Sequence, residues 1–431
     1  MHAGVSSPSL QVVAAFEDAA RAIVSTQYVR AAAAEEAVAG GQPQLVIEPG
    51  SEQELAKVLK LANDASLAVI PRGGGTKLAW GNPPQSAHVV LSTSRLHGII
   101  EHAWSDLTVT VQAGCTMKQL RHALAEHGQR LALDPLWPSR ATVGGVLSTN
   151  DSGAWRLRFG SLRDLIIGVT LALPDGTVAK SGGKVVKNVA GYDLPKLVTG
   201  ALGTLGVITQ ATFRLHPLPK ESRTISCLAS NADQAQRLLL AIQSSKLAHS
   251  AAQVRFIESM QPQIDVLFEA TEAGLTAQVE QLKSILAPLP VIDPGVVVWN
   301  AREELYSAAK DNESGSALAK ISVLPAQVSE AFEALAAITA NRARCNAVMQ
   351  ATGIGSIYLE ALPTALADVL KTLRGKLEQM GGSVMIAHHP SAMPALDAWG
   401  DPGDALPLMR TVKQQFDSKF TLNPGRFVGA I

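Results

Sequence analysis

The sequence predicts an α+β protein with more than one domain. Its 431 residues exceed the length of a single domain, for which roughly 150 residues is typical. Hydrophobic residues make up 47% and charged residues 17%, which is the composition of a chain that folds around a core and excludes wholesale disorder. From residue 45 onward, short strand and helix patterns alternate, and glycine turns separate the strands of the middle third.

Residues 1–42 are expected to form an N-terminal helical extension. Alanine-rich runs at 29–34 and 35–39 favour a helix, because alanine loses no side-chain entropy there. Gly40, Gly41 and Pro43 then interrupt the pattern.

Residues 43–220 are expected to form the first full domain. A strand at 45–47 precedes a helix at 52–65, whose N-cap is Ser51. Another strand, at 67–70, ends in a run of glycines. Further strands are expected at 89–91, 107–112, 166–173 and 207–215.

Residues 221–405 are expected to form a second domain, with 406–431 as a separate C-terminal segment. Leucine-rich faces at helical spacing recur four times, centred near residues 240, 282, 332 and 372. The strands between them are expected at 296–299, 321–324, 357–360 and 384–387. An antiparallel sheet with helices on one face is the packing that this alternation favours.

Charge and cysteine content restrict the partners and the compartment. The 37 basic and 37 acidic residues cancel, so we expect no nucleic-acid partner recruited by bulk charge. Cys115, Cys227 and Cys345 are too far apart to form a disulfide framework or a metal cluster by themselves, which favours a reducing cytoplasm. Neither a secretory signal nor an apolar run of about 18 residues occurs, so membrane contact is expected only through partners.

The segment from Pro71 to Lys77 reads Pro-Arg-Gly-Gly-Gly-Thr-Lys and follows a predicted strand. Three consecutive glycines let the backbone approach a ligand closely and direct several N–H groups at phosphate oxygens. A flexible turn explains the same residues equally well. Neither the Rossmann fingerprint nor a Walker loop is present, which disfavours classical NAD binding.

Small residues and amides dominate residues 138–217, where a core would carry leucine. The relevant segments are 141–145, 149–153, 158–164, 186–194 and 203–209. Such a lining offers many backbone donors and little bulk, as expected around a large planar cofactor that carries a pyrophosphate.

These segments, in this order, resemble the FAD-binding domain of the vanillyl-alcohol oxidase superfamily, the PCMH-type fold. The resemblance runs from about residue 43 to 219 and resumes at 422–426, Leu-Asn-Pro-Gly-Arg. The run Lys-Asn-Val-Ala-Gly-Tyr-Asp at 187–193 and the ending from Phe416-Asp417 most resemble the E subunits of bacterial glycolate oxidases. The resemblance implies an FAD-binding domain of two subdomains, an α/β cap with an antiparallel sheet, and a C-terminal return to the flavin.

The resemblance also implies roles for individual residues. The pyrophosphate would be bound by Arg72, Gly73, Gly74, Gly75, Thr76 and Lys77, together with Thr142, Gly144 and Gly145. The ribityl chain or the isoalloxazine would lie near Asn150, Ser152 and Gly153, and the adenine near the backbones of Val207 and Ile208. The residues that would close over the reactive end are Asn423 and Arg426. Lys187, Asn188 and Tyr192 are further candidates, and each also fits turn or helix-cap geometry.

Two absences shape the expected chemistry. Many superfamily members attach FAD through a histidine just after the glycine loop, where this chain has Thr76, so the resemblance implies non-covalent FAD. Cys115 is an alternative attachment point, although a small buried cysteine explains it better. The metal-binding His-x-Gly-Asp-Gly-Asn-x-His segment, which the resemblance associates with self-sufficient D-2-hydroxy-acid dehydrogenases, is also missing.

His388-His389 is the nearest substitute for that segment. Neighbouring side chains on a strand point to opposite faces, so the pair is a poor chelate and no metal is expected. Either imidazole could instead act as a general base. The catalytic base is therefore not identified, and the candidates for catalysis are Arg426, Asn423, His388 and Tyr192.

Three functions remain open. The first is the FAD subunit of a glycolate oxidase-type complex, with a second FAD subunit and an iron–sulfur subunit as partners; this chain would then oxidise glycolate or a similar 2-hydroxy acid, or relay electrons. The second is a self-sufficient FAD-dependent dehydrogenase of a 2-hydroxy acid such as D-lactate. The third is a nucleotide-binding module without redox chemistry, which explains the glycine loop but not the other motifs.

Overall fold

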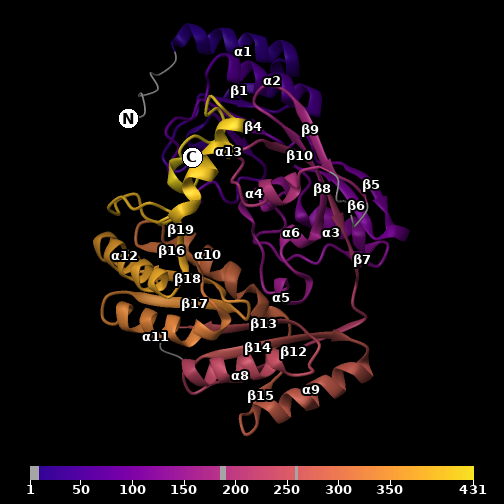
Figure 1. The fold of residues 1–431 in the computed structure, drawn as a ribbon, viewed down its shortest axis with the longest axis vertical. Helices are drawn as coiled ribbons and strands as arrows, with labels where there is room; N and C mark the ends of the chain where they lie inside the picture. Colours follow the sequence, from indigo (N-terminus) through magenta and orange to yellow (C-terminus); the bar gives the residue numbers. More distant parts are fainter. Residues whose placement is uncertain (1–8, 185–190, 258–260) are drawn as a thin grey trace. The chain divides into compact units, whose positions relative to one another are not determined.

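The computed structural model describes residues 9–184, 191–257 and 261–431. Two compact units make up the protein (Figure 1). The first unit comprises Met1–Ser152, Ser161–Pro217 and Asp401–Ile431, and the second comprises Gly153–Gly160 and Leu218–Gly400. The chain passes from one unit to the other after residues 217 and 400. The transfer of the short segment 153–160 to the second unit was not expected from the sequence.

One sheet of the first unit has four strands in the order β1 (Val29–Ala31), β2 (Leu45–Ile47), β4 (Val89–Ser92) and β3 (Val69–Arg72). The strands β2, β4 and β3 run parallel, and β1 joins antiparallel. The helices α1 (Leu10–Val24) and α2 (Glu52–Asp64) share a buried apolar cluster with this sheet. Ser51 accepts a hydrogen bond from the Glu54 N–H and caps α2, as expected.

The helix expected at residues 29–39 is wrong. Val29–Ala31 form an edge strand on β2, and Ala34–Glu36 form a short 3₁₀ helix. Val29 is buried in the same cluster as α1, so pairing and burial override the helix propensity of the alanines. The helical extension is limited to α1 in the described residues.

The second sheet of the first unit is antiparallel and has five strands. Their order is β5 (Ile99–Ala103), β6 (Thr108–Gln112), β10 (Val207–Arg214), β8 (Ile166–Ala172) and β9 (Val178–Gly182). The helices α3 (Met117–Ala125) and α4 (Val143–Thr149) share its apolar cluster with the shorter α6 (Leu162–Leu165) and α7 (Leu194–Val198). The strand pair β7 (Gln129–Arg130) and β11 (His216–Pro217), together with α13 (Leu406–Phe416), completes this unit.

The second unit is built on an antiparallel sheet of eight strands. Their order is β15 (Val291–Ile292), β12 (Glu221–Leu228), β14 (Gln263–Ala270), β13 (His249–Phe256), β17 (Arg344–Gln350), β18 (Ile354–Glu360), β16 (Ser316–Ser322) and β19 (Ser383–His388). Apolar side chains on one face pack against α8 (Ala232–Ser244), α9 (Glu272–Leu286), α11 (Val328–Thr339) and α12 (Pro363–Gln379).

Two features of the second unit correct the expectations. The strand expected at 296–299 is a 3₁₀ helix at Val297–Asn300, and a short apolar run cannot distinguish the two by periodicity. Helices also lie on the second face of the sheet, where α10 (Ala301–Asp311) accepts a hydrogen bond from Ser316 and α5 (Arg156–Phe159) packs on β13.

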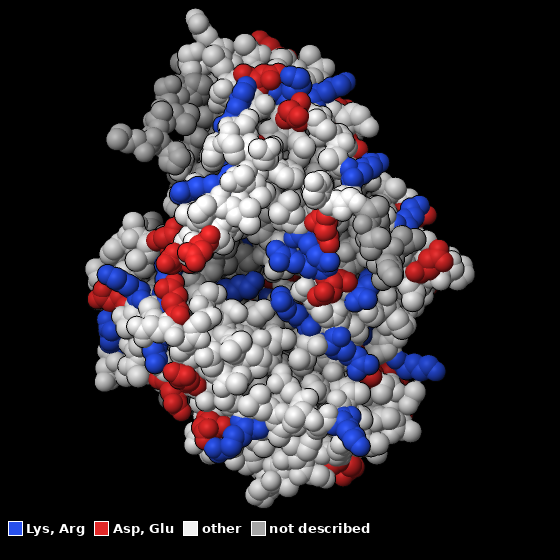
Figure 2. Space-filling view, in the orientation of Figure 1, with Lys and Arg blue, Asp and Glu red and all other residues white. Residues whose placement is uncertain are grey.

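The α+β fold class is confirmed. Among the described helices, none combines the length and apolar character needed to cross a membrane. Basic and acidic side chains both occur across the face shown in Figure 2, consistent with the zero formal charge.

Candidate functional site

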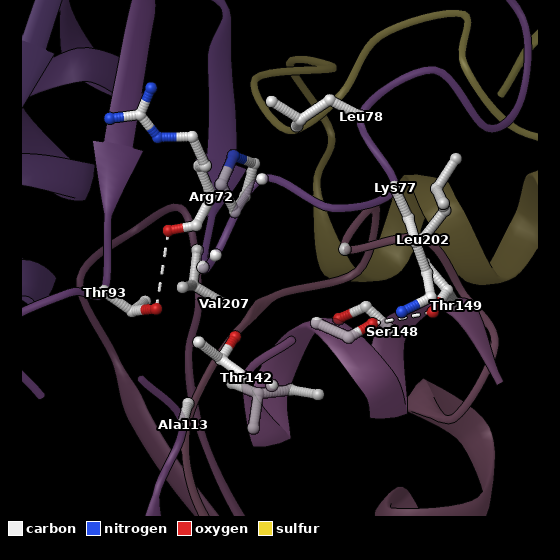
Figure 3. A pocket seen from close by; sticks show the side chains of 18 of the residues that line it. Arg72, Lys77, Leu78, Thr93, Ala113, Thr142, Ser148, Thr149, Leu202 and Val207 are labelled. Atoms are coloured by element: carbon white, nitrogen blue, oxygen red, sulfur yellow. Dashed lines mark hydrogen bonds between the residues drawn. The ribbon is translucent and has the colours of Figure 1, made fainter. Parts of the chain in front are cut away.

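A pocket of the first unit gathers four segments that are far apart in the sequence (Figure 3). They are the glycine loop after β3, the start of α4, the residues leading into β10, and the C-terminal turn near Asn423. The predicted cofactor-binding residues that line it are Arg72, Gly73, Gly74, Gly75, Thr76, Lys77, Thr142, Gly144, Gly145, Val207, Ile208, Asn423 and Arg426.

Glycine is required in this wall because neighbouring atoms leave no room for a Cβ atom. A Cβ atom on Gly74 would lie 1.7 Å from the Arg140 carbonyl oxygen. One on Gly73 would lie 2.0 Å from the Thr142 hydroxyl, and one on Gly144 would lie 2.9 Å from the Ala113 Cβ. Contacts this short are forbidden, so the wall presents bare backbone to the pocket.

The Thr142 side chain provides a second indication of a ligand. Its hydroxyl is buried and has no hydrogen-bond partner among the described residues, although Thr142 lines the pocket. A buried hydroxyl without a partner costs free energy unless something bonds to it. A phosphate oxygen accepts a hydrogen bond from a hydroxyl and from backbone N–H groups, so this wall fits a pyrophosphate.

The Arg72 side chain is held by an acidic residue from the segment before the domain. Its Nη1 atom donates to Glu36 Oε1 at 2.8 Å, and Figure 3 shows the guanidinium pointing away from Thr142. Arg30 also donates two hydrogen bonds to Glu36. The Arg30 bonds, followed by the Arg72 bond, lower the pKa of Glu36 to about 2 despite the opposing effect of burial. Arg72 thus contributes to the pocket chiefly through its backbone.

The Lys77 side chain is a buried cation in the pocket. Its ammonium lies 3.0 Å from Asp151 Oδ2, and Asp151 is fully buried. Asp151 also accepts a hydrogen bond from the Leu136 N–H at 2.9 Å. The centroids of the Trp80 and Trp137 rings lie 5.9 and 5.8 Å from the ammonium. The Lys77–Asp151 ion pair therefore lies next to two aromatic rings.

The C-terminal turn is tied to the other walls. Asn423 has a φ of 46° and donates from Nδ2 to the Leu202 carbonyl at 2.6 Å. Arg426 is buried, and its Nη2 atom donates to the carbonyls of Leu78 and Trp80 at 2.5 and 2.8 Å. Burial lowers the pKa of Arg426 to about 10. Both side chains therefore brace the pocket, and neither has a demonstrated catalytic contact.

Several predicted residues do not line this pocket. Asn150 ends α4 with a φ of 46°, Ser152 is buried, and Gly153 begins the segment that belongs to the second unit. Tyr192 is 89% exposed. Lys187 and Asn188 lie outside the described residues.

His388 belongs to the second unit, at the end of β19. Its Nε2 atom is buried and lacks a hydrogen-bond partner in the described part of the chain. Burial is the largest cause of its lowered pKa, followed by the nearby His389. Burial therefore favours the neutral imidazole and opposes its protonation. No group of three or more His, Cys, Asp or Glu side chains with the geometry of a metal site occurs in residues 9–184, 191–257 and 261–431.

The Cys115 thiol is a poor attachment point for a cofactor. It is buried, and burial raises its pKa to about 11, so little thiolate is present at neutral pH. Cys115 is also not among the residues that line the pocket.

The lining residues that were not predicted from the sequence are Pro71, Leu78, Thr93, Ala113, Ser148, Thr149, Leu202, Gly203 and Gly206. The run 203–209 was recognised as part of the motif set, but only two of its residues were assigned. No local signal distinguishes Thr93 or Ala113 from ordinary strand-end residues, because Thr93 reaches the pocket by bonding to the Arg72 carbonyl and Ala113 by packing against Gly144.

Residues 43–182 match the model of a family described as an FAD binding domain. The first unit contains an FAD-binding domain. Two solved structures share the fold of the whole protein at low identity. They are 4-ethylphenol oxidase from Gulosibacter chungangensis (TM-score 0.77, 16% identity, 98% of each chain) and p-cresol methylhydroxylase (TM-score 0.77, 15% identity, 97% of each chain). The PCMH-type fold is thereby confirmed.

Three curated relatives resemble the protein in sequence. The glycolate oxidase subunit GlcD of Bacillus subtilis is 30% identical over 71% of this chain and 62% of its own length. The D-lactate dehydrogenase of Archaeoglobus fulgidus is 37% identical over 42% of this chain and 41% of its own length. The D-2-hydroxyglutarate dehydrogenase of Xanthomonas citri is 26% identical over 89% of each. The matched region thus spans less than two thirds of the first two relatives, and the resemblance to E subunits stays a prediction.

FAD fits the pocket of its domain. The bare backbone of the glycine loop and the Thr142 hydroxyl suit the pyrophosphate, and a flavin at Thr76 would lack the histidine needed for attachment there. The residues that would hold FAD come from all four segments of the pocket.

Proposed function

We propose that this protein is an FAD-dependent oxidoreductase that converts a small 2-hydroxy acid, such as glycolate, to the 2-oxo acid, and that it works as the FAD-binding subunit of a glycolate oxidase-type complex. The observation that carries the proposal is the glycine-walled pocket with the unpartnered Thr142 hydroxyl, inside a domain whose family binds FAD. The relatives support the substrate class, since their names cover glycolate, D-lactate and D-2-hydroxyglutarate.

The reaction removes a hydride from C2 and a proton from the hydroxyl group, which is a two-electron oxidation. Bound FAD would supply the hydride acceptor. The glycine loop and Thr142 bind and orient the cofactor, while the Lys77–Asp151 pair and Arg426 hold the surrounding walls. The group that accepts the hydroxyl proton is not identified: His388 was a sequence candidate, but it belongs to the second unit and its Nε2 atom is buried.

Electrons must then leave this protein, and the proposed acceptor is an iron–sulfur subunit. Three cysteines cannot hold such a cluster by themselves, and Cys115 lies in a different unit from Cys227 and Cys345. The name of the Bacillus relative, a glycolate oxidase subunit, supports a complex with other subunits, of which we propose that one is a second FAD subunit. The complex is proposed to be cytoplasmic, with contact to the inner face of the membrane only through partners.

A self-sufficient 2-hydroxy-acid dehydrogenase is the alternative. The alignment with D-2-hydroxyglutarate dehydrogenase favours it, because that alignment covers 89% of both proteins and includes the second unit. In this case the protein would oxidise its substrate without another subunit.

An anaerobic titration separates the two functions. The purified protein is loaded with FAD, glycolate or D-lactate is added, and the visible flavin band is followed. Bleaching without any other subunit would establish the self-sufficient dehydrogenase. A flavin that stays oxidised until a sister subunit is added would support the complex and a relay role. A protein that cannot take up FAD would contradict both and leave the nucleotide-binding module.

The same preparation tests the mode of attachment. Since Thr76 takes the place of the attaching histidine, acid denaturation is expected to release all of the flavin into the supernatant. Yellow protein in the precipitate would contradict non-covalent binding.

A further inference from the structure

Lys413 carries a charge in α13 although its side chain is completely buried. Its ammonium donates to the Thr204 carbonyl at 2.8 Å, the Leu422 carbonyl at 3.0 Å and Asp417 Oδ2 at 2.7 Å. A lysine ammonium has three donors, and all three are used. The contacts join α13 to the segment around Thr204, which lies 209 residues earlier, and to Leu422, which lies 9 residues later.

Asp417 lies one helical turn after Lys413 and organises the C-terminal turn. Its Oδ1 atom accepts from the Thr421 N–H at 2.9 Å, and its Oδ2 atom accepts from the Leu422 N–H at 2.7 Å. The carboxylate is fully buried as well. The Lys413–Asp417 pair therefore fixes the Leu422 backbone at both its N–H and its carbonyl, and the Thr421 backbone at its N–H.

Both fixed segments continue directly into the walls of the FAD pocket. Leu202, Gly203 and Gly206 flank Thr204 and line the pocket, and Asn423 follows Leu422 and lines it too. The two walls touch, because Asn423 Nδ2 donates to the Leu202 carbonyl at 2.6 Å. A Cβ atom on Gly203 would lie 3.3 Å from that nitrogen, so the walls tolerate little relative displacement.

Stability alone does not explain a buried ion pair at this place. Removing two charges from water costs about as much as their attraction returns, and apolar residues of similar volume often stabilise as well. Burial lowers the pKa of Lys413, while Asp417 acts in the opposite direction. What an apolar pair would not supply is the set of directed bonds to the Thr204 and Leu422 carbonyls.

We propose that Lys413 is a positioning residue for the FAD pocket, which holds the Thr204 and Leu422 segments in register through three directed hydrogen bonds. Lys413 does not itself line the pocket and acts only through its neighbours. The proposal rests on the FAD site of the proposed function and not on the substrate, so it can be tested by cofactor binding without turnover.

The test compares three variants of the full-length protein. Lys413→Met removes the directed bonds at similar side-chain length but leaves the Asp417 carboxylate buried without its cation. The double variant Lys413→Met/Asp417→Asn also removes that charge and is therefore expected to fold more readily. Lys419→Met is the matched control, because Lys419 is exposed and donates to the Asn63 carbonyl outside the pocket. The dissociation constant for FAD is measured by flavin fluorescence, the visible circular dichroism reports the flavin environment, and denaturant unfolding of the apoprotein reports stability.

The double variant is expected to fold and to bind FAD about tenfold or more weakly, a change of about 1.4 kcal/mol, with an altered visible dichroism. Lys419→Met is expected to match the parent. A folded double variant with the parent's affinity and spectrum would overturn the proposal. Failure of both Lys413 variants to fold would also overturn it, because the ion pair would then be needed for folding itself. A parent protein that binds no FAD would instead refute the proposed function.

Discussion

The two units bury charge in different ways. In the first unit, Lys77 and Arg426 line the FAD pocket, and Glu36 and Asp151 bind residues that line it. In the described residues of the second unit, Asp265 is the fully buried charged side chain, and it lies in the middle of the eight-stranded sheet.

The difference follows from what each unit must hold. Asp265 is saturated by Arg255, Ser226 and Gln253 on adjacent strands, so its charge serves the sheet itself. In the first unit, Asp151 and Arg426 instead bond to backbone groups of loops: Asp151 accepts from the Leu136 N–H, and Arg426 donates to the Leu78 and Trp80 carbonyls. Loops around a cofactor need side-chain bonds to hold a shape that strands hold with backbone bonds.

Gly74→Ala is expected to give the largest effect on the first unit. Its Cβ atom would overlap the Arg140 carbonyl, so the backbone must move and the affinity for FAD should fall by about 100-fold. The matched control is Gly375→Ala in α12, where nothing lies within 4 Å and alanine favours the helix. Fluorescence titration with FAD measures both. Equal affinities for the two variants would refute the close-contact wall.

Arg426→Met should affect both binding and folding. The Leu78 and Trp80 carbonyls would lose their donor in a buried site, so the free energy of unfolding should fall by about 2–4 kcal/mol and FAD should bind about tenfold more weakly. Arg410→Met is the control, since Arg410 is exposed and is expected to change stability by less than about 0.5 kcal/mol. Denaturant unfolding measures the stability of each variant, and titration with FAD measures its affinity. A loss of stability without a loss of affinity would show that Arg426 does not support FAD binding.

Asp265→Asn tests whether the buried charge of the second unit affects stability without affecting FAD binding. Loss of the buried carboxylate weakens its bidentate bonds with Arg255, so the free energy of unfolding should fall by about 2 kcal/mol while FAD affinity stays unchanged. Glu272→Gln, which alters an exposed pair with Arg223, should have almost no effect. A fall in FAD affinity with Asp265→Asn would contradict the view that this buried charge stabilises only its own sheet.

The smallest expected effect is a dependence of stability on pH. His88 is buried, and its Nδ1 atom accepts a hydrogen bond from the Ala68 N–H, so burial lowers its pKa below that of the unfolded state. The unfolded state then binds the proton first, and stability should fall as the pH drops below about 6.5. His249 and His388 also have pKa values lowered by burial and add to the same trend.

His88→Asn tests this sign, because it keeps an acceptor but does not titrate. Unfolding at pH 7.5 and 5.5 should show that the parent loses up to about 1 kcal/mol more than the variant. Glu36 does not interfere, since its pKa of about 2 means that its stabilising contribution is lost only below the unfolded value of 4.5. A variant with the same pH dependence as the parent would assign the effect to other groups.

Local patterns in the sequence predicted many of the helices and strands correctly. Ser51 before an amphipathic run specified α2, and the leucine spacing specified α8, α9, α11 and α12, because capping and 3.6-residue periodicity are local properties. The ordered set of glycine and amide segments resembles the FAD-binding domain of a known superfamily, and that resemblance predicted the cofactor.

The partners of individual strands and side chains could be known only from the folded structure. The strand at Val29–Ala31 exists because β2 offers a partner and the core accepts Val29, which outweighs alanine's preference for a helix. Arg72 is directed to Glu36, and Arg426 to two carbonyls, by residues that no local pattern connects to them. Lys413 shows the same limit, since its three acceptors lie on segments up to 209 residues away and only the folded protein brings them together.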